Sequence, residues 1–201
     1  MNIREPAGRG YRMTARAASA LATADRILDA AVEVFWERPS DQVSLDEVAA
    51  RASVSVQTVI RRFGGKEGLF AAAAMRETAA VRDQRAQAPV GDVAEAVRVL
   101  LDHYEVFGDR VLKIVAEQDR VPALRQIVDG GRIVHRQWCG RVFAAELGDR
   151  VGVARERLLA QLIAVCDVYM WKLLRRDAKL SRVQAELALV ELLTPLLAGD
   201  V

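Results

Sequence analysis

One segment, residues 43–65, constrains the fold of this chain more than any other part of the sequence. Ser44-Leu45-Asp46-Glu47 is a capping box, in which a serine and a glutamate three residues apart satisfy backbone N–H groups at the start of a helix. Ser55 can cap a second helix only a few residues later, and Gly64-Gly65 ends it. The sequence therefore predicts two short helices joined by a tight turn near Ser53.

Apolar residues elsewhere recur at the spacings of three and four that are typical of amphipathic helices, and no segment alternates as a strand does. We therefore expect an all-α fold of about nine helices. Gly130, Gly131 and Gly140 lie inside one predicted helix, where they indicate a kink or close packing. Besides the two short helices, the predicted helices run from Thr23 to Pro39, Lys66 to Arg85, Val93 to Phe107, Val111 to Gln118, Pro122 to Leu147, Arg155 to Arg176 and Arg182 to Leu197.

The length and charge of the chain limit its organisation. A chain of 201 residues with 52% hydrophobic residues suits one compact body and a smaller module. The net charge of +2 gives no general affinity for nucleic acid, so the distribution of charge has to be considered. Residues 1–20 hold four arginines and one glutamate and are predicted to be a flexible basic arm, although a solubilising tail fits them as well. Residues 53–66 hold three basic residues and no acid.

Several classes of protein find no support. Cys139 and Cys166 are too few for a disulfide framework and favour a reducing cytoplasm. The longest uncharged run in the apolar C-terminal half, Leu158 to Cys166, is far shorter than the roughly 20 residues that span a bilayer, so we expect a soluble protein with no membrane partner. His135 and Cys139 have metal-compatible spacing but no third ligand nearby. With no catalytic or nucleotide-binding motif, we expect neither an enzyme nor a bound metal or cofactor.

An ordered series of residues between Leu21 and Val81 forms a recognisable pattern. Its members are Arg26-Ile27-Leu28-Asp29-Ala30-Ala31, Phe35, Ser44-Leu45-Asp46-Glu47-Val48-Ala49, Val54-Ser55, Thr58-Val59, Phe63 and Lys66-Glu67-Gly68-Leu69. This series resembles the DNA-binding domain of the TetR family of transcriptional regulators. The resemblance implies a three-helix helix-turn-helix DNA-binding domain at 21–88, with its motif at about 44–63, and a helical ligand-binding and dimerisation domain at 89–201.

The resemblance also assigns DNA contacts. Thr58 matches a threonine that contacts DNA in the family, and Lys66 matches a lysine at a helix N-terminus, which favours phosphate. Val56, Gln57 and Arg61 fall on variable positions that face the groove. Because amides pair with adenine and guanidinium groups with guanine, Gln57 and Arg61 are the expected base readers.

Three residues depart from the family pattern. Ser53 stands where glycine is common, Ile60 where a phosphate-binding tyrosine is common, and Arg62 where histidine is common, so the phosphate contact is expected to move from Ile60 to Arg62. The full set of expected DNA-binding residues is Ser44, Ser55, Val56, Gln57, Thr58, Ile60, Arg61, Arg62 and Lys66.

The C-terminal domain is expected to bind a small effector and to form the dimer. A set of aromatic and polar residues could line an effector pocket, although such a stripe is more often plain core. The last two helices are broadly apolar and are expected to join two subunits. The expected pocket residues are His103, Tyr104, Phe107, His135, Trp138, Phe143, Tyr169 and Met170, and the expected dimer contacts are Leu162, Leu189, Leu193 and Leu196.

The sequence therefore predicts a cytoplasmic, homodimeric repressor that binds double-stranded operator DNA and is released by an unidentified small-molecule effector. Two alternatives stay open. One is a regulator that activates transcription or that responds to no small molecule. The other is a helical enzyme or ligand carrier with a vestigial DNA reader.

Overall fold

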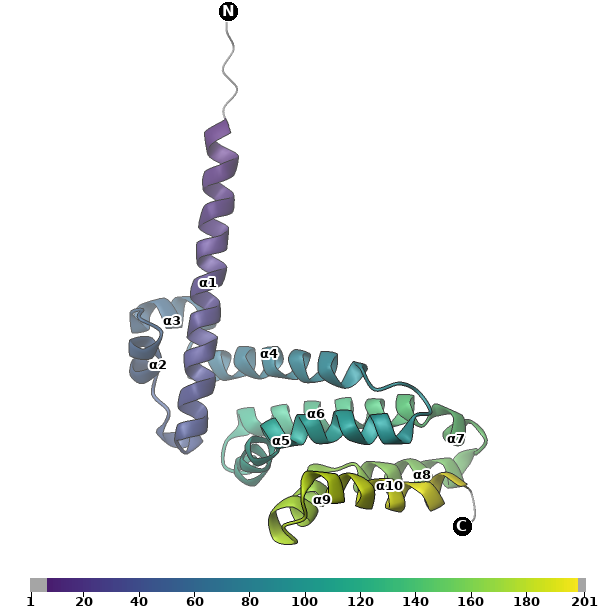
Figure 1. Cartoon of the computed structure of the whole chain (residues 1–201). Helices are drawn as coiled ribbons and strands as arrows, with labels where there is room; N and C mark the ends of the chain where they lie inside the picture. Colours follow the sequence, from purple (N-terminus) through teal and green to yellow (C-terminus); the bar gives the residue numbers. More distant parts are fainter. Residues whose placement is uncertain (1–6, 199–201) are drawn as a thin grey trace, which may run out of the picture. The chain divides into compact units, whose positions relative to one another are not determined.

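The computed structural model describes residues 7–198, although not the side chains of 7–13, 15 and 123. Every regular element in this range is a helix, so the predicted all-α fold is confirmed (Figure 1). The elements are α1 Ala7–Glu37, a 3-10 turn Ser40–Gln42, α2 Leu45–Arg51, α3 Val56–Phe63, α4 Lys66–Ala86, α5 Val93–Glu117, α6 Pro122–Val142, α7 Ala144–Gly148, α8 Gly152–Val165, α9 Val168–Lys172, a π-turn Leu173–Asp177 and α10 Arg182–Ala198.

The chain forms two compact units that divide between Met75 and Arg76, within α4. The sequence predicts a boundary after Ala88, at the Pro89-Val90-Gly91 break. The observed division lies before the predicted boundary because the last turn of α4 is bonded to the second unit. The Arg85 carbonyl there accepts hydrogen bonds from Trp138 Nε1 at 3.0 Å and from Arg141 Nη2 at 3.1 Å, which fasten this turn to α6.

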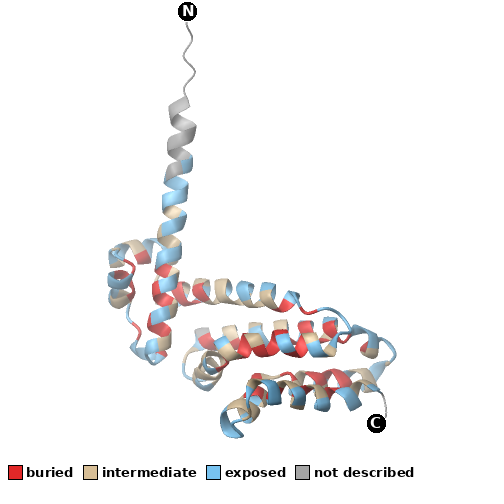
Figure 2. Cartoon of the chain, in the orientation of Figure 1, coloured by how far each residue is buried: buried red, intermediate tan, exposed pale blue. Residues whose placement is uncertain are grey.

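The first unit contains α1, α2, α3 and the start of α4. Ile27 and Val34 of α1, Val48 of α2 and Val59 of α3 are completely buried, so the predicted apolar stripe of α1 does face a core (Figure 2). The ring of Phe70 from α4 lies edge-on to a phenylalanine of α1, with centroids 5.8 Å apart. A small core therefore sets the angles of the two short helices.

Helix α1 begins at Ala7, whereas the sequence predicts a flexible arm over residues 1–20 and a helix start at Thr23. From residue 7 onward the structure has helix where the sequence predicts an arm, and residues 1–6 lie outside the described range. Thr23 lies inside this helix, and its hydroxyl donates to the Ser19 carbonyl one turn earlier, at 2.8 Å. Alanines between the arginines favour a continuous helix over this stretch.

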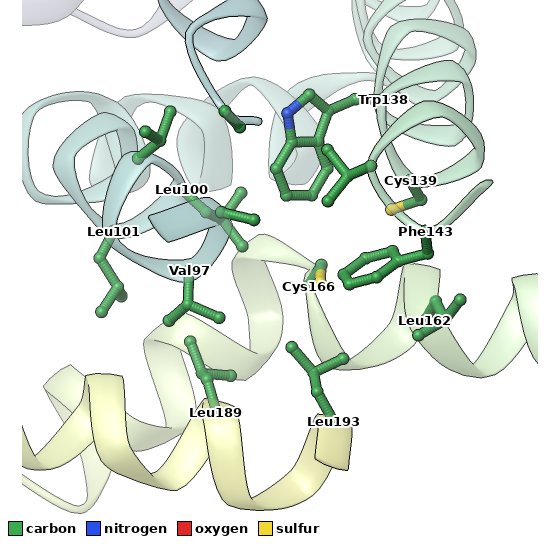
Figure 3. Packing of buried hydrophobic residues seen from close by; sticks show 14 of the residues in the cluster. Val97, Leu100, Leu101, Trp138, Cys139, Phe143, Leu162, Cys166, Leu189 and Leu193 are labelled. Carbon is green, nitrogen blue, oxygen red and sulfur yellow. The ribbon is translucent and has the colours of Figure 1, made fainter. Parts of the chain in front are cut away.

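The second unit is a layered helical body. Helix α5 packs against α6, α9 and α10, and α8 packs against α6 and α10. Pro122 opens α6, as predicted. Side chains from all five helices meet in one core, part of which Figure 3 shows. Its completely buried members include Ala96, Leu101, Phe143, Leu162 and Leu193.

Helix α5 is one helix of 25 residues, whereas the sequence predicts a separate helix from Val111. Gly108 at its centre is not a break but a contact point. A Cβ atom placed on Gly108 would lie 2.4 Å from Cζ3 of Trp171, so only glycine lets the buried indole of α9 approach this closely. The Trp171 indole then donates from Nε1 to Glu105 of the same helix α5 at 3.0 Å.

Two predicted long helices are interrupted. The backbone leaves the helical conformation at Phe143, which separates α6 from α7, and at Cys166, which precedes α9. Asp167 caps the start of α9, because its carboxylate accepts a hydrogen bond from the Tyr169 N–H at 2.9 Å. The glycines at 130, 131 and 140 do not serve close packing, because a Cβ at each would meet no atom within 4 Å.

Candidate nucleic-acid interface

Helix α2 starts where the capping box predicts. The Ser44 hydroxyl accepts a hydrogen bond from the Glu47 N–H at 3.2 Å, so the first half of the predicted box forms. The second half does not form, because the Glu47 carboxylate instead accepts a hydrogen bond from Arg38 Nε at 3.0 Å. One carboxylate thus joins the end of α1 to the start of α2.

The turn between α2 and α3 places Ser53 in the left-handed region, with φ 55°. The Ser53 N–H donates to the Ala50 carbonyl at 3.1 Å, and the next N–H, of Val54, donates to the Ala49 carbonyl at 2.9 Å. This pattern ends α2 as a glycine would. The serine therefore tolerates the strained conformation that its position in the sequence implies.

Helix α3 is fixed at both ends. Ser55 caps its start, accepting a hydrogen bond from the Thr58 N–H at 3.2 Å, and its hydroxyl also lies 2.9 Å from the Thr58 hydroxyl. Gly64 ends the helix with φ 77°, and its N–H donates to the Ile60 carbonyl at 2.8 Å. Buried Val59 holds the inner face of the helix.

An ion pair fixes α2 on α1. Arg51 donates from Nη1 and Nη2 to the two carboxylate oxygens of Glu37, at 2.6 and 2.7 Å. The hydrogen bond from Arg51 lowers the pKa of Glu37, and the same bond raises the pKa of Arg51. This arginine is therefore engaged within the protein and is not a free basic group.

The outer face of α3 is polar and basic. Gln57, Arg61 and Arg62 are exposed, and Ile60 between them is 39% exposed. Within residues 7–198, neither arginine forms an ion pair or a hydrogen bond with another side chain. The helix thus presents an amide and two unengaged guanidinium groups on a rigid support, an arrangement suited to the edges and phosphates of a duplex.

The structure distinguishes the remaining predicted contacts. Ser44 and Ser55 are exposed at two helix N-termini, while Val56 and Thr58 are half-buried. Lys66 opens α4 as predicted, but its ammonium donates to the Asp41 carbonyl at 3.3 Å and lies 5.6 Å from the centroid of the Phe70 ring. Lys66 therefore has a structural role in this unit.

Most of the predicted pocket residues gather in the second unit. His103, Tyr104, His135, Trp138 and Phe143 are buried there. The Tyr104 hydroxyl donates to the Cys166 carbonyl at 3.1 Å, and burial raises the pKa of this tyrosine to about 12. Phe107 and Met170 are partly buried.

Tyr169 is the exception among these residues, because its side chain is 52% exposed on the surface of α9. It therefore does not belong to the buried group. Sequence reasoning missed the residue at the centre of that group, the buried Arg85 of α4. An arginine in a helix rich in alanine and arginine gives no signal that separates it from the exposed arginines of the same helix.

The predicted dimer contacts are largely wrong. Leu162, Leu189 and Leu193 point into the core of their own unit, with exposed fractions of 0%, 2% and 0% (Figure 3). Leu196 is partly buried against the same core. The large apolar side chains that α10 does expose are Val183, Leu187 and Leu192.

Two short helices at a tight turn, with an exposed polar face on the second, form a helix-turn-helix motif, which is an arrangement that DNA-binding proteins use. Comparison with known proteins finds a family resemblance in this region. Residues 27–73 match the family model described as bacterial regulatory proteins, tetR family. The first unit is therefore similar to the N-terminal domain of that family, as the sequence predicts.

A curated relative is similar in the same region. An uncharacterized HTH-type transcriptional regulator of Mycobacterium tuberculosis is 36% identical over 78 residues, which are 39% of this chain and 38% of that protein. The match thus covers well under half the length of the relative.

Two solved structures share the fold over most of the chain. A transcriptional regulator from Rhodococcus has a TM-score of 0.67 at 22% identity, covering 89% of this chain and 98% of its own. The regulator FadR from Bacillus subtilis, solved in complex with stearoyl-CoA, has a TM-score of 0.62 at 17% identity, covering 88% and 98%. None of the helices in the described part of the chain combines the length and apolar character needed to cross a bilayer.

Proposed function

We propose that this protein is a cytoplasmic, homodimeric transcriptional repressor that binds double-stranded operator DNA through α3 and is released by a small-molecule effector. The observation that carries the DNA-binding part is the outer face of α3. Its two arginines have no partner among the described side chains, and the caps at Ser55 and Gly64 hold the helix that carries them. Such a helix needs no rearrangement of its own to enter a major groove.

The residues of this face have distinct proposed roles. Gln57 reads adenine and Arg61 reads guanine, while Arg62 binds phosphate in place of Ile60. Ser44, Ser55, Thr58 and Lys66 complete the phosphate contacts at the N-termini of α2, α3 and α4, and Val56 lies beside the base edges.

The dimer is proposed to form through the outer face of α10. Val183 and Leu187 lie one turn apart on α10 and are 66% and 58% exposed, an apolar surface that a partner subunit would cover. A two-fold dimer would place two copies of α3 about 34 Å apart, one turn of DNA. Sedimentation tests the interface: Leu187→Asp should give monomers that keep their helical content. A dimer that persists would place the interface elsewhere.

The effector is proposed to bind in the second unit. The support is the group of buried polar and aromatic residues there, together with the likeness to the regulator solved with stearoyl-CoA. Because binding is reciprocal, operator DNA should weaken the effector by the factor by which the effector weakens operator binding.

Two experiments test the function. Selection of binding sites from random DNA should return a palindrome with half-sites about one turn apart, and a genome-wide footprint should place it at promoters. Transcription from such a promoter should rise when the gene is deleted. Transcription that falls instead would make the protein an activator, and failure to select any DNA would overturn the proposal.

A further inference from the structure

Arg85, in the last turn of α4, is a buried charge that pairs with no acidic side chain in the described part of the chain. Its exposed fraction is 5%. Among residues 7–198, no aspartate or glutamate lies within ion-pairing distance of it. Buried arginines are normally paired, because an uncompensated charge is poorly solvated in the protein interior. The structure therefore keeps a positive charge at a place where its own acidic residues do not neutralise it.

Neutral groups hold the guanidinium in place. Arg85 Nη1 lies 2.9 Å from His135 Nδ1, and because a guanidinium can only donate, Nδ1 is the acceptor. The proton of His135 is then on Nε2, which donates to the Ile163 carbonyl at 3.3 Å. The rings of Tyr104 and Trp138 flank the guanidinium, with their centroids 5.2 and 5.7 Å from Cζ. These contacts orient the charge without cancelling it.

Two buried polar atoms beside this arrangement are Arg85 Nε and His103 Nδ1. Neither has a hydrogen-bond partner within the described residues. Nε and Nη2 form one edge of the guanidinium, and this edge can bind both oxygens of a carboxylate. The hydrogen bond to His135 uses Nη1, which is not part of that edge. Burial, and then the charge of Arg85, lower the pKa of His103 to about 3, so its imidazole is neutral and can donate a hydrogen bond.

We propose that Arg85 is the anchor for the carboxylate of the effector, and that the effector is an organic acid with an apolar body. The carboxylate binds the Nε edge of Arg85 and is the missing counter-ion, His103 supplies a further donor, and the apolar body contacts the rings of Tyr104 and Trp138. This inference rests on the proposed function, since it names the ligand class of the effector site.

The test compares carboxylates with their uncharged amides on the full chain. The probes are octanoate with octanamide and phenylacetate with phenylacetamide, measured by calorimetry and by tryptophan fluorescence. At least one acid should bind about 10- to 150-fold more tightly than its amide, as expected for a hydrogen-bonded charge pair. Arg85→Met should abolish this preference. Arg82→Met, which removes an exposed arginine one turn earlier on the same helix, is the matched control and should retain it.

The outcomes separate this inference from the proposed function. Equal binding of acid and amide by the wild type, no binding of either acid, or a preference that persists in Arg85→Met would overturn the assignment of Arg85. Circular dichroism checks that Arg85→Met is folded, and Arg85→Lys, which keeps the charge but lacks the chelating edge, is the second variant and should also lose most of the preference. Operator binding is measured on the same samples. If the wild type bound operator and an uncharged compound released it while no acid did, the proposed repressor function would stand. The proposal that the effector is a carboxylate would be rejected.

Discussion

Replacing Arg61 by alanine should relax the DNA specificity of this protein at one base position in each half-site. A bidentate arginine–guanine contact contributes about 1–3 kcal/mol of discrimination. A dimer with two reading helices would lose about 2–6 kcal/mol on its operator, which corresponds to about 30-fold to about 20,000-fold in affinity. Arg61 is exposed and has no intramolecular partner among the described side chains, so the free energy of unfolding should change by less than about 0.5 kcal/mol.

The assay is binding-site selection followed by fluorescence anisotropy on the selected operator at several salt concentrations. Two matched variants separate base reading from charge. Arg61→Lys keeps the charge and should keep the salt dependence while losing discrimination at the same base. Arg62→Ala should weaken all sequences alike and lower the salt slope by about 1 per subunit. If selection with Arg61→Ala returned the wild-type motif, the assignment of Arg61 as a base reader would be refuted.

Three further predictions concern stability, each measured by urea unfolding. Gly108→Ala should destabilise the protein by about 1–3 kcal/mol, because the new Cβ would clash with Trp171. Gly130→Ala places its Cβ in open space within a helix and should stabilise the protein by about 0.5–1 kcal/mol. Equal effects of the two substitutions would contradict the packing argument. The pKa of His103 is about 3 in the folded protein and about 6.5 in the unfolded chain, so below pH 6.5 the unfolded chain takes up a proton that the folded protein does not. The free energy of unfolding should therefore fall by about 2 kcal/mol between pH 6.5 and pH 5. His103→Asn should remove that loss. Ser53→Gly should stabilise by about 0.5–1 kcal/mol by relieving the left-handed φ of 55°; a loss of stability would mean that the hydroxyl has a role there.

Local signals in the sequence predicted the two short helices α2 and α3 well. The hydroxyls of Ser44 and Ser55, and a glycine at 64 that can adopt positive φ, each act within one turn of the chain. Their effects depend little on distant residues, so the bounds of α2 and α3 follow from them. The same signals fail at Ala7, where a run without sustained apolar periodicity still forms helix.

Long-range partners explain what the sequence could not predict. Leu189 and Leu193 repeat with helical spacing, but a repeat does not say whether that face meets its own core or a second subunit, and here it meets its own core. Arg85 is indistinguishable in sequence from its exposed neighbour Arg82, because its burial depends on His135 and Trp138, about fifty positions further along the chain. Such contacts are set by the packing of α4 with α5 and α6.

The two thiols of the protein, both in the second unit, make the opening of that unit measurable. Cys139 and Cys166 have exposed fractions of 0% and 1%, and the chain has no other cysteine. An alkylating reagent can therefore modify the native protein only during transient openings of the core of the second unit. The first unit contains no cysteine and gives no signal in this measurement. The rate of alkylation, followed by mass spectrometry, then reports the free energy of those openings. A compound that binds this core should slow the alkylation in proportion to its occupancy, which offers a screen that needs neither operator nor reporter gene.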